Sequence, residues 1–175
     1  MIALALSIHT VRPKEVDKLH RLSIQTFKET FETQNTAEDM QAYIEKQLNL
    51  EQLTTELQNQ DSFFYFAHLD KEVVGYLKLN FNQAQKESVL EGKAFEIERF
   101  YILKMHQGKG LGSQLFNKAI EIGKDKGYEQ LWLGVWEHNI RALEFYAEKG
   151  LTAFGTHVFQ LGQDAQTDIL MQLKL

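Results

Sequence analysis

A strand, a short glycine loop and the start of a helix follow one another in residues 95–122, and this order constrains the fold most. Residues 95–103 form an apolar run of strand type, and residues 107–112 read QGKGLG. A helix of period 3.6 then places apolar side chains on one face, namely Leu111, Leu115, Ala119 and Ile122. Glycines let the backbone approach a ligand closely, and the first N–H groups of a helix have no partner inside it. Since these donors and the helix dipole favour a phosphate or pyrophosphate, the segment predicts a site for a phosphorylated cofactor.

The spacing of the glycines separates this loop from two common phosphate-binding loops. A P-loop ends in Gly-Lys-Ser/Thr, whereas Lys109 lies between two glycines. The dinucleotide fingerprint needs its third glycine one residue later than Gly112. The pattern Gln107-x-x-Gly110-x-Gly112 instead resembles the pyrophosphate loop of the GNAT-type N-acetyltransferases, which bind acetyl-coenzyme A (acetyl-CoA). The structural alternative is a glycine-rich turn that only joins a strand to a helix.

A second block strengthens this resemblance. Residues 130–136 (QLWLGVW) read as a strand, and a helix is expected over residues 140–149. Asn139, Ala142, Phe145-Tyr146 and Gly150-Leu151 follow the spacing of the second conserved block of the same family. The resemblance extends over the whole chain and is most specific between Glu96 and Leu151. It implies that Asn139 holds the pantetheine arm and that Tyr146 lies near the thioester sulfur.

The resemblance also implies a set of cofactor-binding residues along the two blocks. They are Phe100, Tyr101, Ile102, Gln107, Gly108, Lys109, Gly110, Leu111, Gly112, Ser113, Asn139, Ala142, Tyr146 and Lys149. By the same resemblance, strands diverge to admit the pantetheine arm, and a backbone N–H near Ile102 meets the negative charge on the carbonyl oxygen. Lys109 and Ser113 are expected to contact phosphate, although for each lysine a solvated surface role is the alternative.

Acetyl transfer to an amine also requires groups that move protons. An alkylammonium has a pKa of about 10.4, so a proton acceptor should lie beside it. Glu96 and Glu98 alternate with Ile97 on the strand that enters the glycine loop, so both carboxylates point to one face. Either is a candidate base, with Glu96 ranked first by family analogy, and an ordinary solvent-facing pair is the alternative. Tyr146 is the candidate acid for the leaving thiolate, and its alternative is a packing role beside Phe145.

Composition sets bounds on the class of protein. A chain of 175 residues with 43% hydrophobic and 25% charged residues fits one domain, residues 1–175. The chain has no cysteine, and its six histidines show no metal-ligand spacing, so no metal is expected. A formal net charge of −5 argues against nucleic acid as the main partner. We read residues 1–7 as strand rather than signal peptide, and no apolar run approaches the roughly 20 residues of a membrane-spanning helix. A cytoplasmic location is the default expectation.

The periodicity of the remaining chain predicts an α/β fold. Strands are expected at residues 6–12, 63–69, 73–80, 95–103, 130–136, 152–159 and 168–174, and helices at 14–31, 37–59 and 140–149, with a further helix from Leu111 through at least Ile122. Residues 95–136 should form a parallel strand–helix–strand crossover, and Gly127 and Gly150 should end helices in left-handed conformation. With the resemblance, this predicts a GNAT-like mixed, mostly antiparallel seven-stranded sheet flanked by four helices. Residues 81–93 are polar and poorly patterned, which is typical of a mobile insert.

The acceptor is the least defined part of the function. Residues 1–60 hold nine acidic and six basic residues, including Glu29, Glu32, Glu38 and Asp39 near a helix–helix junction. An acidic mouth would attract a polycation such as spermidine or spermine, and the motif Thr26-Phe27-x-x-Thr30-Phe31 resembles a polyamine-acetylating bacterial branch. The sequence therefore predicts an N-acetyltransferase that acts on a small primary amine by direct attack in a ternary complex. Acetylation of a protein N-terminus or of an amino acid, a non-catalytic CoA sensor and a dinucleotide-binding oxidoreductase stay open as alternatives. The oligomeric state also stays open, with a homodimer among the options.

Overall fold

The computed structural model describes residues 4–175, which build one seven-stranded sheet. Its strands are β1 (Leu6–Thr10), β2 (Ser62–Leu69), β3 (Glu72–Asn80), β4 (Ala94–Ile102), β5 (Gln130–Trp136), β6 (Thr152–Leu161) and β7 (Asp164–Lys174). The spatial order is β1-β2-β3-β4-β5-β7-β6, and every neighbouring pair is antiparallel except β4 and β5. The predicted mixed, mostly antiparallel sheet with one parallel crossover is therefore confirmed.

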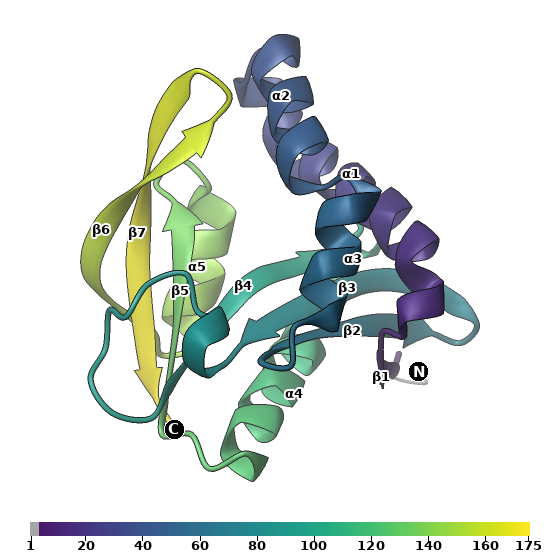
Figure 1. The fold of residues 1–175 in the computed structure, drawn as a ribbon. Helices are drawn as coiled ribbons and strands as arrows, with labels where there is room; N and C mark the ends of the chain where they lie inside the picture. The colour runs from purple at the N-terminus through teal and green to yellow at the C-terminus, as the bar shows by residue number, and fades with distance from the viewer. Residues whose placement is uncertain (1–3) are drawn as a thin grey trace.

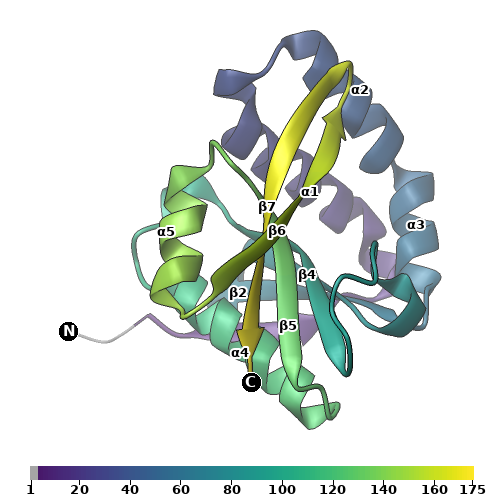
Figure 2. The ribbon, with the colours of Figure 1, turned by 90° about the vertical axis from the view of Figure 1, so that its left-hand side faces the viewer.

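Helices cover both faces of this sheet (Figures 1 and 2). On one face lie α1 (Val16–Phe31), α2 (Ala37–Gln47) and α3 (Leu50–Gln58). On the other lie α4 (Leu111–Asp125) and α5 (Ile140–Glu148). The larger core joins Leu115 and Phe116 of α4 to Tyr146 of α5, whereas Leu19 of α1 and Leu53 of α3 belong to a second core on the opposite face.

The chain has five α-helices in the described residues, so the expectation of four was wrong by one. The predicted helix over residues 37–59 is interrupted at Leu48 and Asn49. Leu48 is buried, and the Asn49 side chain accepts a hydrogen bond of 2.8 Å from the backbone N–H of Gln52. Asn49 thus starts α3 as an N-cap, because an asparagine oxygen satisfies an N–H that lacks a partner in the first turn.

The strand and helix ends otherwise lie close to the predicted ones, with one exception at the C-terminal hairpin. β7 begins at Asp164, four residues before the predicted start, because Gly162 and Gln163 form a two-residue turn. Gly162 has a φ of 58°, which glycine adopts without a steric penalty. Gly127 and Gly150 have φ values of 80° and 90°, so both predicted left-handed helix ends are confirmed. Residues 1–3 lie outside the described residues, and of the predicted strand 1–7 only Leu6 and Ser7 belong to β1.

The parallel pair β4–β5 is short, and the two strands separate early. Their pairing covers only Ala94–Gln130, Phe95–Leu131 and Glu96–Trp132, although both strands continue beyond it. A register shift between β3 and β4 follows at Lys78/Leu79, opposite residues 97–99. Because a β-bulge bends a strand and increases its twist, β4 turns away from β5 at this point. The sheet is therefore open between residues 97–102 and 133–136.

Residues 81–93 lack regular structure except for a short 3-10 turn, yet three successive residues contact the sheet. Gln85 Oε1 accepts a hydrogen bond of 2.8 Å from Trp132 Nε1. The backbone N–H of Lys86 donates to Glu96 at 3.0 Å, and Glu87 lies 2.9 Å from His157 Nδ1. These contacts tie the expected insert to β4, β5 and β6, so it forms part of the site described next.

Candidate active site

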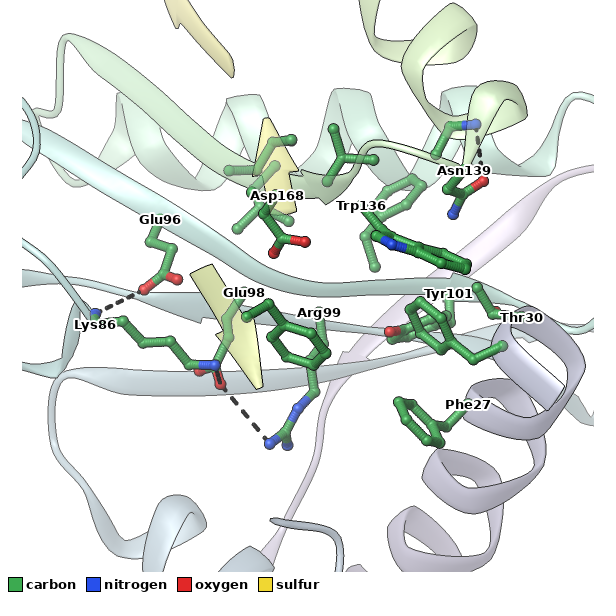
Figure 3. Close-up of a pocket in the computed structure, with 18 of the residues that line it drawn as sticks. Phe27, Thr30, Lys86, Glu96, Glu98, Arg99, Tyr101, Trp136, Asn139 and Asp168 are labelled. Carbon is green, nitrogen blue, oxygen red and sulfur yellow. Dashed lines mark hydrogen bonds and ion pairs between the residues drawn. The ribbon is translucent and has the colours of Figure 1, made fainter. Parts of the chain in front are cut away.

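A pocket of about 430 Å³ lies where β4 and β5 separate. Its lining comes from both sides of the sheet: Phe27 and Tyr43 from α1 and α2, and Asn139, Ala142 and Tyr146 from the α5 region. The pocket therefore extends through the gap in the sheet rather than along one face. Figure 3 shows side chains from β4, β7 and the α1 side converging on this space.

The glycine loop lies at the N-terminus of α4, as the sequence predicts. Gly108 and Gly110 have φ values of 75° and 76°, and Gly110 caps α4 without any side-chain hydrogen bond to the first turn. The Gln107 side chain closes the loop, because its Nε2 donates to the carbonyl of Ile102 at 2.8 Å and its Oε1 accepts from Arg141 at 2.7 Å. The N–H groups of the first helical turn consequently have no side-chain cap and are available to an anion.

The remaining predicted phosphate contacts lie near this helix end. A Cβ added at Gly112 would lie 3.6 Å from Phe145 of α5, so the two helices approach closely there. The ammonium of Lys149 lies 5.4 Å from the centre of the same Phe145 ring. Lys109 is exposed in the loop and Ser113 is half-buried in the first turn. Leu111 is fully buried, so only its backbone can face a ligand.

Asn139 and Ala142 form the start of α5 beside the gap. Asn139 Oδ1 accepts a hydrogen bond of 3.2 Å from the Ala142 backbone, which caps the helix. The side-chain nitrogen Nδ2 of Asn139 makes no hydrogen bond to residues 4–175, and Asn139 lines the pocket (Figure 3). Asn139 thus caps α5 through its side-chain oxygen, while its side-chain nitrogen stays available to a ligand in the gap.

The predicted residues of β4 divide between the two faces of the strand. Phe100 packs against Phe145 and Tyr146 on the α5 side, with ring centres 5.7 and 6.1 Å apart. Tyr101 lines the pocket from the α1 side (Figure 3). The Ile102 side chain is buried in the core, so only its backbone can contribute to a site.

Glu98 belongs to a buried ion cluster at the floor of the pocket. Its carboxylate pairs with Lys78, with Lys86 at 3.1 Å and with Arg99 at 3.8 Å. Glu56 of α3 completes the cluster, because it accepts hydrogen bonds of 2.8 and 3.1 Å from the Arg99 guanidinium. Burial alone would raise the pKa of Glu98, but Arg99 and the two lysines hold it well below its ordinary value. This carboxylate is saturated with cations and poorly suited to take a proton.

Glu96 lies two residues earlier in a different environment. It is 4% exposed, and its Oε2 accepts one hydrogen bond of 3.0 Å from Asn80 Nδ2 and one of 3.0 Å from the Lys86 backbone. Burial raises the pKa of Glu96, and the negative charge of Glu98 raises it further. A carboxylate with a raised pKa and a lining position is the better proton acceptor of the two.

Tyr146 lies on the opposite side of the gap. Its ring packs among Phe100, Phe116 and Phe145, and its side chain lines the pocket. Burial raises the pKa of Tyr146 well above its ordinary value, so the phenol keeps its proton at neutral pH. The structure therefore shows the packing role for Tyr146 and also places it on the pocket lining, where the predicted role as proton donor stays a prediction.

A histidine between two carboxylates forms another part of the lining. His157 Nε2 lies 3.2 Å from Asp168 Oδ2, and His157 Nδ1 lies 2.9 Å from Glu87. Gly134 makes room for this arrangement, because a Cβ there would lie 3.2 Å from Asp168 and 3.4 Å from His157. Burial raises the pKa of Asp168, although the hydrogen bond from His157 acts in the opposite direction. Figure 3 shows the Asp168 carboxylate pointing into the pocket.

The acidic residues from which the sequence predicted an acidic mouth lie outside the pocket lining. Glu29, Glu32, Glu38 and Asp39 do not line the pocket. Glu29 accepts a hydrogen bond from the Lys104 backbone at 2.8 Å, and Asp39 accepts one from the Gln163 backbone at 2.8 Å. These two carboxylates hold chain turns, so the prediction for the helix junction was wrong. Phe27, Thr30 and Phe31 of the predicted motif do line the pocket.

The polar residues of the pocket region that were missed at the level of sequence include Asn80, Lys86, Glu87, Arg99, His157 and Asp168. For Asn80 a signal existed, because Lys78 and Asn80 alternate with leucines on a strand next to Glu96 and Glu98. For Asp168 and His157 the sequence holds no such signal, since their meeting depends on the β6–β7 register, in which they are direct partners.

Two features are absent from residues 4–175. No group of three or more His, Cys, Asp or Glu side chains there is arranged to hold a metal ion. Likewise, none of the helices in this part of the chain is long and apolar enough to cross a membrane.

Comparison with known proteins identifies the class. Residues 18–151 match the acetyltransferase (GNAT) family model. An uncharacterized N-acetyltransferase in the pepI 3′ region of Lactobacillus delbrueckii subsp. lactis is 46% identical over 170 residues, 97% of this chain and 98% of that protein. The chain therefore belongs to the GNAT family of acetyltransferases. It is an acyltransferase that uses acetyl-CoA as co-substrate and acetylates amines.

Solved structures share the fold. The PaiA N-acetyltransferase from Thermoplasma acidophilum in complex with coenzyme A has a TM-score of 0.80 at 21% identity, covering 98% of this chain and 100% of that one. A spermidine N-acetyltransferase from Vibrio cholerae in complex with CoA and spermine has a TM-score of 0.69 at 18% identity, covering 97% and 95%. At these identities the likeness concerns the fold alone.

Proposed function

We propose that this protein acetylates a primary amine of a small polycation of the polyamine class, by direct attack of the amine on acetyl-CoA in a ternary complex. The observation that carries the proposal is the pocket itself. It joins the glycine-loop side of the sheet, through the gap between β4 and β5, to a chamber lined by carboxylates and aromatic rings. Donor and acceptor can therefore meet at the gap from opposite faces.

The donor half of the proposal uses the residues of the two sequence blocks. The free N–H groups at the start of α4 fit a pyrophosphate, with Lys109, Ser113 and Lys149 close to that helix end. The pantetheine arm would lie in the gap, where β4 and β5 no longer pair, within reach of the side-chain nitrogen Nδ2 of Asn139. Backbone N–H groups of β4 that face the gap would meet the carbonyl oxygen.

The acceptor half uses the charge balance of the pocket. Four carboxylates line it (Glu87, Glu96, Glu98 and Asp168), against two cations (Lys86 and Arg99). Leaving His157 out of the count, carboxylates exceed cations by two, and this favours an amine that carries more than one positive charge. Aromatic side chains of α1 and α2, including Phe27 and Tyr43, line the opposite wall and suit an alkylammonium chain.

The chemistry follows from the positions of two proton-transfer groups. Glu96 takes a proton from the bound ammonium, and the neutral nitrogen attacks the carbonyl carbon of the thioester. The nitrogen of the tetrahedral intermediate still carries the two protons of the neutral amine and releases one of them to solvent. The intermediate then collapses with cleavage of the carbon–sulfur bond, which leaves the acetamide and a thiolate. Tyr146 then donates its phenolic proton to that sulfur and regains a proton from solvent after release.

An acceptor screen tests this proposal. Release of free CoA thiol from acetyl-CoA would be followed with purified protein and spermidine, spermine, lysine or a peptide with a free N-terminus. We expect the highest kcat/KM for the polyamines, with acetyl-CoA and amine both required for turnover. An Asp168→Asn variant should lose affinity for the polyamine, whereas Asp164→Asn, outside the pocket on the same strand, serves as the matched control. Faster turnover of the peptide than of any polyamine would contradict the acceptor assignment.

A further inference from the structure

A row of polar side chains crosses three strands and ends at Glu96. The sheet register pairs Ser62 of β2 with Asn80 of β3, and Asn80 with Glu96 of β4. Cross-strand partners project from the same face of a sheet, so the three side chains meet in sequence. Ser62 Oγ donates to Asn80 Oδ1 at 2.7 Å, and Asn80 Nδ2 donates to Glu96 Oε2 at 3.0 Å.

This row fixes which way the Asn80 amide points. Its oxygen accepts the hydroxyl proton of Ser62, so its NH2 group faces β4. Both hydrogens of that NH2 group are used, because the second bonds to Glu98 at 2.7 Å. A flipped amide would place its oxygen against two carboxylates that only accept hydrogen bonds when ionised. Asn80 is 1% exposed and Ser62 is 7% exposed, so little water competes for these bonds.

The two oxygens of Glu96 consequently differ. Oε2 accepts both hydrogen bonds of this carboxylate, one from Asn80 and one from the Lys86 backbone. Among residues 4–175 no group donates a hydrogen bond to Oε1. Both donors on Oε2 are neutral, whereas the neighbouring Glu98 receives the cations of the cluster.

We propose that Asn80 is a positioning residue for acetyl transfer: it holds Oε2 of Glu96 so that Oε1 faces the acceptor amine, and the Ser62 hydroxyl keeps its amide in the productive orientation. The inference rests on the proposed function, because it takes Glu96 as the proton acceptor. Asn80 donates a hydrogen bond to each of the two carboxylates, but of these two only Glu98 forms ion pairs with the cations of the cluster.

The sign of the expected effect follows from the charge that Asn80 stabilises. Its N–H group favours the ionised form of Glu96, and only that form accepts a proton from the ammonium. Without the donor, a higher pH is needed to ionise Glu96. The acid side of the pH profile of kcat/KM for the amine should therefore move upward, and activity should return as the pH rises. A defect in folding or packing alone would lower the rate without moving this profile.

The test uses Asn80→Ala and Ser62→Ala in the full chain, with kcat/KM for spermidine measured between pH 5 and 9. For Asn80→Ala we expect the acid limb to rise by about one pH unit, which is roughly a tenfold loss on that limb. Ser62→Ala should shift it in the same direction by less, and the KM for acetyl-CoA should not change in either variant. Ser23→Ala, which removes another buried hydroxyl with no contact to Glu96, is the matched control and should keep the wild-type limb.

The outcomes separate this inference from the proposed function. Suppose that Glu96→Gln abolishes turnover, while Asn80→Ala and Ser62→Ala keep the acid side of the kcat/KM profile at the wild-type pH. Asn80 then has no positioning role, and the inference is overturned. A loss of rate that is equal at every pH also overturns it. If Glu96→Gln keeps full turnover, the proton acceptor itself is wrongly assigned. Should Asn80→Ala fail to fold, Ser62→Ala decides: a shifted limb supports the inference and an unshifted limb overturns it.

Discussion

Glu96 and Glu98 project from the same strand and share the amide group of a single residue, Asn80, yet their surroundings are opposite. The Glu96 carboxylate receives two neutral N–H donors, and its pKa is raised by burial and by the charge of Glu98. The Glu98 carboxylate is also buried, but Arg99 and two lysines lower its pKa. Glu98 is the extra residue of the bulge in β4, because Lys78 pairs with Arg99 and Leu79 with Ile97, whereas Glu96 stays in regular pairing with Asn80.

The first prediction uses this contrast as a matched pair of variants. Glu96→Gln should fold normally and lose about 10²–10⁴-fold in kcat, since the loss of a general base has that size. Glu98→Gln should instead lower the free energy of unfolding by about 3–5 kcal/mol, because it leaves buried cations without their partner. Steady-state CoA release and urea unfolding measure the two effects. A stable, fully active Glu98→Gln protein would contradict the role given to the ion cluster.

Acid unfolding provides a second test of the same cluster. Because the pKa of Glu98 is lower in the folded than in the unfolded protein, its contribution to stability is present above the ordinary glutamate pKa of about 4.3 and lost as the pH falls below it. Thermal unfolding between pH 7 and pH 3 should show a steep decline of Tm below that value. In Glu98→Gln the decline should be shallower, since one proton fewer is taken up on unfolding. An identical slope in both proteins would exclude the assignment.

The glycine loop predicts a difference between two equivalent substitutions. Gly110 and Gly127 have φ values of 76° and 80°, and at both a Cβ would meet no atom within 4 Å. Alanine at either position should cost about 1–2 kcal/mol of stability, because both must adopt left-handed backbone. Only Gly110→Ala should also weaken binding of CoA in calorimetry, by roughly tenfold or more for about 1.4 kcal/mol of lost contact. Equal affinity of both variants would count against pyrophosphate binding at the start of α4.

Tyr146→Phe separates the packing role of this residue from its chemical role. The ring contacts to Phe100 and Phe116 are kept, so the Tm should change little. We expect kcat to fall on the order of a hundredfold, because the thiolate loses its proton donor. Tyr65→Phe is the control, since Tyr65 is half-buried on β2 and does not line the pocket. Unchanged turnover of Tyr146→Phe would remove the acid from the mechanism.

The sequence predicted the parts of this site that depend on local order. The loop from Gln107 to Gly112 and the start of α5 at Asn139 are encoded by consecutive residues. The structure places the loop at the N-terminus of α4 and Asn139 on the pocket lining. Glycine spacing and helix periodicity suffice for such segments, because the backbone conformation they require is set within a few residues.

Other parts of the site depend on register between distant strands. Asn80 meets Glu96 only because β3 and β4 pair in one particular way, and Asp168 meets His157 only through the β6–β7 register. A shift by one residue would turn each side chain to the other face, and the sequence of one strand does not specify its partner. The prediction from the carboxylates of residues 1–60 failed for a related reason. A count of acidic residues does not reveal that Glu29 and Asp39 accept hydrogen bonds from the backbone of distant segments.

The most direct test of the central claim is the initial rate of CoA release from acetyl-CoA and spermidine, measured from pH 5 to pH 9 for wild type and Glu96→Gln. We expect amine-dependent release by the wild type, with an acid limb in kcat/KM above the ordinary pKa of glutamate. In Glu96→Gln the rate should be low and this limb absent. Amine-independent thiol release, or the same acid limb in both proteins, would contradict the assignment of Glu96 as the group that takes the proton of the amine.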